Sequence, residues 1–368
     1  GNVIKLLHFS NVPFDENDIN SGEGTASFRP VEVLLSGLNR PGERHGTKYT
    51  YTAPGYRLKY KDMKDYRNET GRKLEILMED KPTGLEVCSN IQFYDGISVI
   101  RSWTELKNNG EEDLGVEYVS SFALLGIDKE GLLSTDDKLE VLIARNAWQK
   151  ELIWNRFSMD QLGMSISQPD KVRRSSQTIS VGNTGNWSTK NYLPMGCLKN
   201  KETDSILFWQ IEQNGSWYWE ISDQDGHMYL QLSGPTEHQS HWWKNLKPGD
   251  TFASVPVSVG SACGDVEEAA GELTKYRRAI RRKNEDNEKL PVIFNDYMNC
   301  LWGDPTTEKE LPLIDKAKEA GCEYFCVDCG WYSAGFWWDG VGEWLPSKER
   351  FPGGLKEVMD YIRSKGMV

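Results

Sequence analysis

The sequence predicts a multidomain β plus α/β protein, in which an antiparallel β-sandwich precedes the first two βα units of a parallel fold. In residues 1–264, short apolar or aromatic runs alternate with turn signals, as in all-β domains. Residues 265–289 have a helical pattern and are predicted to form a helical linker. In residues 290–368 strand and helix patterns alternate, and a length of 368 residues suits about two domains.

The N-terminal pattern is a repeated succession of strand, turn and strand. Ser98–Leu106 is predicted to be a strand, Asn108–Gly110 a turn and Val116–Leu125 the return strand. The same pattern recurs twice further along the domain, and no strong helical period interrupts it. Trp217 and Trp219 share one face of a predicted strand, so we expect both in the core.

The linker is predicted from a single apolar stripe. Leu273, Tyr276 and Ile280 fall on one side of a helix. The basic residues at 277–283 suit the solvated face of that helix better than a nucleic-acid patch.

The C-terminal part alternates strands with helices. Pro291–Tyr297 is an apolar strand that ends in polar groups, and Tyr324–Asp328 is a second apolar strand. Between them, Asp304–Gly321 has a capping side chain, a proline in the first turn and a terminal glycine, which predict a helix. Apolar positions at helical spacing predict another helix over 355–366. Such units form a parallel sheet or a (β/α)8 barrel.

Polar side chains follow both predicted strands at the point where each strand ends. Asn295, Asp296 and Tyr297 end the first strand, and Asp328 ends the second. In βα barrels, side chains at the carboxyl ends of the strands face the active site. We therefore expect these residues to lie close together.

The residues around Asp328 have the chemistry of a sugar-binding site. Cys329, a glycine and Trp331 follow directly, and Trp338 and Trp344 lie in the next loop. Carboxylates accept hydrogen bonds from sugar hydroxyls, and aromatic faces cover the apolar face of the ring. An alternative stays open, in which the aspartate only caps the strand and the tryptophan packs in the core.

Charge, hydropathy and composition exclude several classes of function. A net charge of −12 without a basic face argues against nucleic-acid binding. No run approaches the ~18 apolar residues of a membrane span. Neither histidine spacing nor a phosphate-binding loop indicates a metal or a cofactor, and none is expected.

The seven cysteines are scattered and odd in number, which suits free thiols and a cytoplasmic protein. Cys326 and Cys329 have C-x-x-C spacing. An odd separation on a strand would place their side chains on opposite faces, so we expect no zinc site there.

Several segments are similar to glycoside hydrolase family 36, the bacterial melibiases and α-galactosidases with relatives of the raffinose synthase type. The similar segments are Pro291–Tyr297, Phe325–Tyr332, Gly342–Trp344, Phe351–Leu355 and Ile362–Met367. Upstream, Trp187–Gly196, Phe208–Trp217 and Trp242–Gly249 resemble the N-terminal β-supersandwich of this family. The resemblance covers essentially the whole chain and is most specific over 291–368.

The resemblance implies an N-terminal β-supersandwich followed by the start of a (β/α)8 TIM barrel. It also implies a retaining exo-acting enzyme that removes terminal α-linked galactose from oligosaccharides such as melibiose and raffinose. The family's nucleophile and acid/base lie on later barrel strands, so this chain is expected to contain no catalytic carboxylate and to be inactive alone.

The site residues that the resemblance implies all belong to substrate binding. Asp328 matches the first aspartate of the family's Asp-Asp-Gly-Trp motif, which binds galactose hydroxyls, and Cys329 replaces the second. Tyr297 stands where the family usually has tryptophan. The expected substrate-binding residues are Asp296, Tyr297, Asp328, Cys329, Trp331, Trp338 and Trp344.

Two other functions and one assembly stay open at this point. A related transferase would move galactosyl groups to an acceptor other than water. The N-terminal domain could instead serve only as a carbohydrate-binding or oligomerisation module. The segment Ser27–Pro30 is similar to one that reaches a neighbouring subunit's pocket in some members, which leaves a homo-oligomer open.

Overall fold

The structure is a computed structural model that describes all residues except 1–2, 15–27, 39–47, 165–176 and 225. Ser27 therefore lies outside the described residues. The chain divides into two compact units, Gly1–Ile280 and Arg281–Val368, and each is described by itself.

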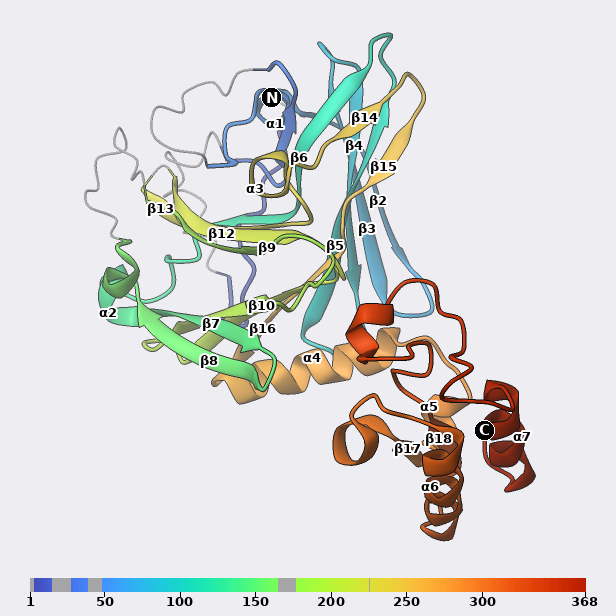
Figure 1. Cartoon of the computed structure of the whole chain (residues 1–368). Coiled ribbons are helices and arrows are strands. Elements are labelled where there is room, and N and C mark those ends of the chain that lie inside the picture. Colours follow the sequence, from blue (N-terminus) through green and yellow to red (C-terminus); the bar gives the residue numbers. More distant parts are fainter. Residues whose placement is uncertain (1–2, 15–27, 39–47, 165–176, 225) are drawn as a thin grey trace. The chain divides into compact units, whose positions relative to one another are not determined.

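The first unit is built from two antiparallel sheets (Figure 1). The six-stranded sheet has the order β1 (Val33–Leu35), β6 (Leu114–Leu125), β13 (His227–Ser233), β12 (Trp217–Gln224) and β9 (Ile179–Asn183), with β14 (Lys244–Leu246) paired to β6. The ten-stranded sheet has the order β2 (Lys59–Arg67), β3 (Arg72–Asp80), β4 (Leu85–Phe93), β5 (Val99–Asn108), β16 (Val257–Cys263), β11 (Ser205–Ile211), β10 (Tyr192–Asn200), β7 (Leu139–Ala147) and β8 (Lys150–Ser158), with β15 (Thr251–Ala253) paired to β5. Short helices connect them: α1 (Ala53–Arg57), α2 (Thr135–Lys138), η3 (Asp160–Leu162) and α3 (Glu237–Ser240).

The main core of this unit lies between the two sheets. Alternate residues of β12, including Trp217 and Trp219, face strands of the larger sheet, and both are fully buried as expected. Trp219 meets Trp209 of β11 edge to face, with ring centroids 5.1 Å apart. The predicted all-β sandwich is therefore confirmed, since each sheet buries one apolar face against the other.

The strands on either side of Asn108–Gly110 were expected to pair with each other as a hairpin, and this prediction is wrong. β5 belongs to the ten-stranded sheet and pairs with β4 and β16, whereas β6 belongs to the six-stranded sheet and pairs with β13. The chain thus crosses from one sheet to the other at this turn. β6 is buried along most of its length on both faces, so its partners are set by burial and not by the adjacent turn.

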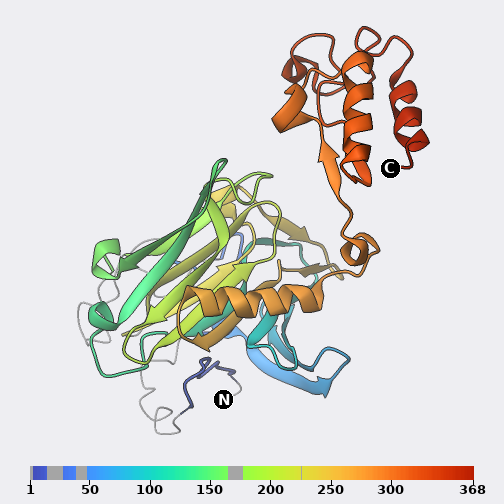
Figure 2. The ribbon, with the colours of Figure 1, turned by 90° about the horizontal axis from the view of Figure 1, so that it is seen from below.

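A long helix, α4 (Val266–Ile280), packs on the other face of the ten-stranded sheet (Figure 2). Its buried residues Leu273 and Tyr276 join a core cluster with Ile206 and Phe208 of β11. Two members of the predicted apolar stripe are therefore buried, whereas the third, Ile280, is exposed. The helix belongs to the first unit.

The second unit contains a two-stranded parallel sheet and two main helices. Its elements are α5 (Asp286–Lys289), β17 (Ile293–Asn295), η4 (Tyr297–Leu301), α6 (Thr307–Glu319), β18 (Tyr324–Cys326), η5 (Trp337–Gly340) and α7 (Leu355–Ser364). β17 and β18 pair in parallel, with Asn295 opposite Cys326. Helices α6 and α7 lie side by side (Figure 2). This succession is the expected pair of βα units.

The helices of the second unit are held by one apolar cluster. Ile314 and Ala317 of α6 pack with Phe325 of β18 and with Val358 and Ile362 of α7. Helix α6 begins after Thr306, whose hydroxyl accepts a hydrogen bond from the Lys309 N–H. The expected helix is confirmed, but it begins later than Asp304, so Pro305 lies before the cap and not in the first turn. The other buried members of this cluster are Cys322, Phe351 and Met367.

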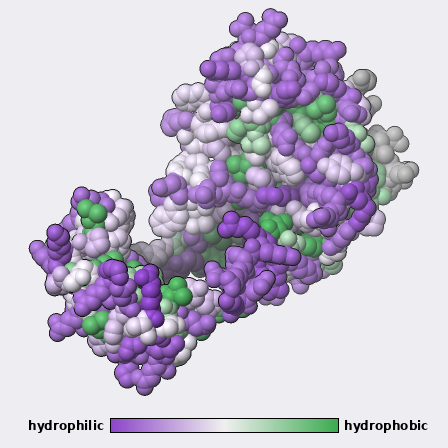
Figure 3. Space-filling view, turned by 90° about the vertical axis from the view of Figure 1, so that its right-hand side faces the viewer, coloured by the Kyte–Doolittle hydropathy of each residue, from purple (hydrophilic) through white to green (hydrophobic). Residues whose placement is uncertain are grey.

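The described part of the chain has no helix that is both long enough and apolar enough to cross a bilayer. On the face shown in Figure 3, polar residues cover most of the surface and hydrophobic residues form small separate patches.

The packing between the sheets predicts the effect of removing one indole. We expect Trp219→Ala to lower the free energy of unfolding of the first unit by about 3–5 kcal/mol, because it leaves a cavity beside Trp209. Trp243→Ala is the matched control, since this side chain is 63% exposed and its loss should cost less than about 0.5 kcal/mol. Urea unfolding followed by far-ultraviolet circular dichroism measures both. Equal losses in the two variants would contradict the sandwich core described here.

Candidate functional site

The predicted carboxylate is exposed at the ends of the two parallel strands. Asp328 lies two residues beyond β18, and its Oδ2 accepts a hydrogen bond of 2.7 Å from Asn295 Nδ2 at the end of β17. Asn295 Oδ1 in turn accepts a hydrogen bond of 2.8 Å from the Tyr297 N–H. One amide side chain therefore bridges the two strand ends and fixes the orientation of the carboxylate.

The backbone of the turn at Asp328 is hydrogen-bonded to the buried side chain of Asp296. Asp296 is only 1% exposed, and its Oδ1 accepts a hydrogen bond of 2.9 Å from the Asp328 N–H. The Asp296 N–H donates to the carbonyl oxygen of Cys326 at 3.2 Å. Asp296 thus lies beneath the turn, and its contacts are with the protein.

The thiol that follows Asp328 stays protonated at neutral pH. Burial, together with the negative charge of Asp328, raises the pKa of Cys329 to about 11. Its S–H is hydrogen-bonded to the Asp328 carboxylate. Cys329 is therefore a weak neutral donor beside the carboxylate and carries no charge of its own.

The C-x-x-C pair forms no metal site. Both thiols are free, and burial also raises the pKa of Cys326. Cys326 ends β18, so Cys329 lies in the following turn and not on the strand. Among the described residues no group of three or more histidine, cysteine or acidic side chains could hold a metal ion.

A glycine allows the turn after Asp328 to come close to a neighbouring segment. Gly330 has a φ of +88°, and a Cβ at this position would lie 1.9 Å from the carbonyl oxygen of Gly303. Any side chain here must move one of the two segments.

Two groups of aromatic residues lie near the strand ends of this unit. Trp331, Tyr332 and Trp344 are in contact, with 4.6 Å between the Tyr332 and Trp344 ring centroids. In the second group, the ring centroid of Trp337 lies 6.0 Å from that of Tyr297 and 5.0 Å from that of Trp338.

A buried arginine fixes the loop that carries both groups. Arg350 is paired with Asp304, and its Nη2 donates to the carbonyl oxygen of Gly335 at 2.7 Å. Its Nε also donates to the carbonyl oxygen of Ser333. The loop backbone is therefore anchored at two carbonyl groups.

The predicted residues are brought together only in part. Asp296, Tyr297, Asp328 and Cys329 meet at the strand ends through the contacts above. Trp331 packs partly against the core cluster of the unit. Trp338 and Trp344 lie on the surrounding loop and are exposed.

Sequence reasoning missed two aromatic residues that contact this set, Tyr332 and Trp337. Asn295 was expected at this strand end, but its hydrogen bond to Asp328 was not. Glu310 of α6 was also missed, although it precedes Ile314 and Ala317 by four and seven residues on the buried stripe of the helix. A charged residue on an apolar stripe is the signal that could have revealed it.

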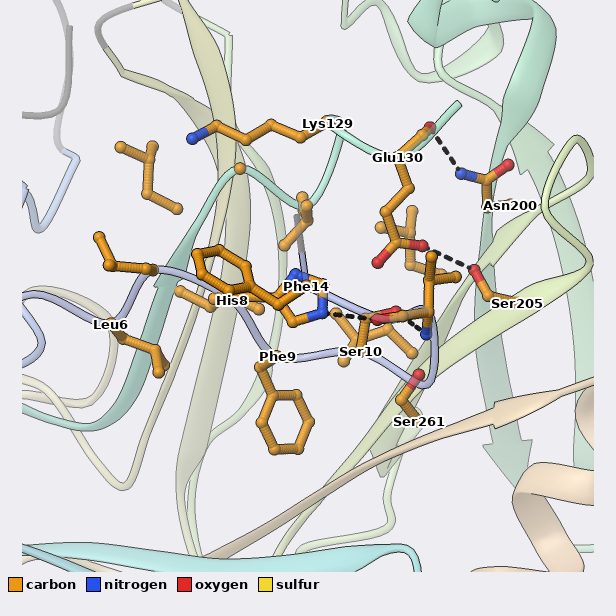
Figure 4. Close-up of a pocket in the computed structure, with 18 of the residues that line it drawn as sticks. Leu6, His8, Phe9, Ser10, Phe14, Lys129, Glu130, Asn200, Ser205 and Ser261 are labelled. Atoms are coloured by element: carbon orange, nitrogen blue, oxygen red, sulfur yellow. Dashed lines mark hydrogen bonds between the residues drawn. The ribbon is translucent and has the colours of Figure 1, made fainter. Parts of the chain in front are cut away.

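The first unit has a separate cavity of about 350 Å³ beneath residues 5–14 (Figure 4). Some of its polar groups are paired with one another: the Glu130 carbonyl oxygen accepts from Asn200 Nδ2 at 3.0 Å, and Glu130 Oε2 accepts from Ser205 Oγ at 3.1 Å. His8 and Phe14 lie against each other, with ring centroids 5.4 Å apart. The described residues that line the cavity include leucines and phenylalanines, and neither tryptophan nor tyrosine.

Comparison with known proteins gives one consistent relationship. Residues 257–368 match the family model described as Melibiase. The α-galactosidase Mel36A of Lactobacillus acidophilus is 24% identical over 311 residues, which are 82% of this chain. The probable α-galactosidase G of Aspergillus terreus is 22% identical over 73% of this chain. In sequence, the chain is therefore similar to α-galactosidases.

Solved structures of GH36 α-galactosidases have the same fold as this chain. The α-galactosidase AgaA of Geobacillus stearothermophilus superposes with a TM-score of 0.71 over 92% of this chain, at 18% identity. A variant of AgaA in complex with stachyose superposes with a TM-score of 0.74 over 100% of this chain, at 16% identity. The expected GH36 architecture is therefore confirmed for the chain.

The chain spans less than half of the length of the relatives that it matches. It spans 38% of the Lactobacillus acidophilus protein and 45% of the AgaA structure.

The close approach at Gly330 predicts a strong effect of one added methyl group. We expect Gly330→Ala to destabilise the second unit by at least ~2 kcal/mol, because the left-handed backbone and the Gly303 carbonyl oxygen both oppose a Cβ. Gly335→Ala is the matched control in the same loop, since a Cβ there meets no atom within 4 Å. Thermal unfolding with peptide-resolved hydrogen exchange would compare the two. If both variants kept wild-type protection, the described turn would be wrong.

Proposed function

We propose that the protein containing this chain is a retaining exo-α-galactosidase that hydrolyses terminal α-linked galactose. The observation that carries the proposal is the placement of Asp328. Its carboxylate is exposed at the carboxyl ends of two parallel strands and is oriented by Asn295. A fixed, charged acceptor of this kind suits the paired hydroxyls of a hexose.

The comparisons support the same substrate class. The named relatives are α-galactosidases, and variants of AgaA have been solved in complex with raffinose and with stachyose. By this reasoning galactose-containing oligosaccharides are the substrates of the whole protein.

The proposed roles of the site residues follow from their contacts. Asp328 accepts hydrogen bonds from galactose hydroxyls, and Cys329 donates to Asp328 in place of a second charged acceptor. Tyr297 and the exposed rings of Trp338 and Trp344 offer apolar faces to the sugar. Asp296 acts indirectly, by holding the backbone of Asp328.

The reaction itself needs two further carboxyl groups. In a retaining glycosidase they stand ~5 Å apart, one attacking the anomeric carbon while the other protonates the leaving oxygen. At the described strand ends, Asp328 is committed to Asn295 and Asp296 is buried, so neither suits these roles. We therefore infer that other parts of the whole protein supply them and that this chain alone has no turnover.

The role of Asp328 predicts a loss of activity in the whole protein. We expect Asp328→Asn to lower kcat/KM on an aryl α-galactoside by roughly 10- to 100-fold, because a charged acceptor is lost at a cost of about 1.5–3 kcal/mol. Asp339→Asn, on an exposed position of the neighbouring loop, should keep wild-type activity. Release of galactose from the aryl galactoside and from raffinose measures the effect.

The same assay decides between hydrolysis and transfer. With sucrose present as an acceptor, a hydrolase releases mainly free galactose and a transferase forms a longer oligosaccharide. If the whole wild-type protein acts on neither substrate, the proposal fails.

A further inference from the structure

A second carboxyl group is buried directly beneath the candidate site. Glu310 of α6 is 0% exposed, and Asp296 beside it is 1% exposed. Glutamate and aspartate are rarely buried this completely unless they are paired. The two groups come from different elements, so their contact joins helix α6 to the end of β17.

The hydrogen bonds of this pair are incomplete without a shared proton. Asp296 Oδ1 accepts from the Asp328 N–H. Asp296 Oδ2 and both carboxyl oxygens of Glu310 are buried, and no N–H or hydroxyl group of another described residue donates to them. The two carboxyl groups lie close enough for each to affect the pKa of the other. Two carboxylates are acceptors only, so a hydrogen bond between them requires a proton on one of them.

The groups that face the pair offer no positive charge. The Asp328 carboxylate lies just beyond β18, and the Cys326 and Cys329 thiols are both close enough for the pair's charge to affect their pKa values. Arg350, from the segment before α7, is engaged with Asp304 and with loop carbonyl groups. In the part of the chain that the structure describes, no lysine or arginine forms an ion pair with Asp296 or Glu310. A proton is therefore the remaining means of neutralising one of the two charges.

We propose that Glu310 is a positioning residue that carries a proton shared with Asp296, and that this proton holds the Asp328 turn in its binding geometry. Protonated Glu310 donates to Asp296 Oδ2, which leaves Asp296 Oδ1 charged and able to accept the Asp328 N–H. Loss of the proton would place two negative charges together beneath the turn. The link to sugar binding rests on the proposed function, whereas the proton itself does not.

The raised pKa of Glu310 supports its assignment as the protonated group. Burial, followed by the hydrogen bond and the charge of Asp296, raises the pKa of Glu310 to about 9. Burial also raises the pKa of Asp296. Because the folded-state pKa of Glu310 lies above its unfolded value of about 4.3, folding takes up a proton. The stabilisation is complete below pH ~4.3 and is lost as the pH rises towards 9.

Peptide-resolved hydrogen exchange between pH 5 and 9 tests the proposal without any sugar. After correction for the intrinsic pH dependence of exchange, we expect protection of residues 324–332 in the wild-type chain to fall as the pH rises. One linked proton corresponds to about a tenfold loss of protection per pH unit. Glu310→Gln keeps a neutral donor but cannot ionise, so its profile should lack this tenfold dependence. Glu308→Gln, on an exposed position of the same helix, should keep the wild-type profile.

A second variant keeps the test decisive if Glu310→Gln does not fold. In Asp296→Asn the amide oxygen can still accept the Asp328 N–H, and the amide N–H can donate to ionised Glu310. The tenfold dependence should again disappear. A Glu310→Gln profile parallel to those of the wild type and Glu308→Gln would overturn the shared proton, even if its protection were lower at every pH.

The two proposals fail separately. If the exchange result is as expected but Asp328→Asn leaves the activity of the whole protein unchanged, Glu310 holds the turn and the proposed function is wrong. If activity depends on Asp328 but the exchange profiles are parallel, the proposed function stands and the shared proton is overturned.

Discussion

The parallel pairing of β17 with β18 is the constraint on which the candidate site depends. This register places Asn295 opposite Cys326, so the two chain segments leave the sheet at the same edge. Asn295 can then reach Asp328, and Asp296 can accept the backbone N–H of the same residue. A shift of one residue would turn these side chains to the other face. The carboxylate is thus positioned by backbone pairing first and by side-chain hydrogen bonds second.

Sequence patterns predicted the elements of this unit because the signals are local. The cap before α6, the glycine after it and the apolar stripe of α7 each depend on residues within a few positions. The pairing of Glu310 with Asp296 depends on a contact between a helix and a strand end, which no local pattern specifies. The aromatic residues show the same limit: the sequence left open whether Trp331 lines the site or packs in the core, and the structure packs it partly against the core cluster.

The sandwich shows why strand recognition does not give strand pairing. β5 and β6 are adjacent in sequence and are separated by a turn signal, yet they lie in different sheets. β5 instead pairs with β16, about 150 residues further along, and so closes the larger sheet. A turn between two apolar strands is compatible both with a hairpin and with a connection from one sheet to the other. Burial of β6 on both faces decides between them, and it becomes apparent only when the whole unit is assembled.

The carboxyl pair beneath Asp328 is better suited to its position than an ion pair would be. A lysine or arginine in place of Glu310 would complete the bonding of Asp296, but it would also bring a positive charge close to Asp328. Such a charge would attract the Asp328 carboxylate and compete with sugar hydroxyls for it. A shared proton completes the buried hydrogen bonds with no net positive charge, so Asp328 keeps its full strength as an acceptor. The arrangement depends on pH because the buried pair keeps a single negative charge only while one of its carboxyl groups is protonated.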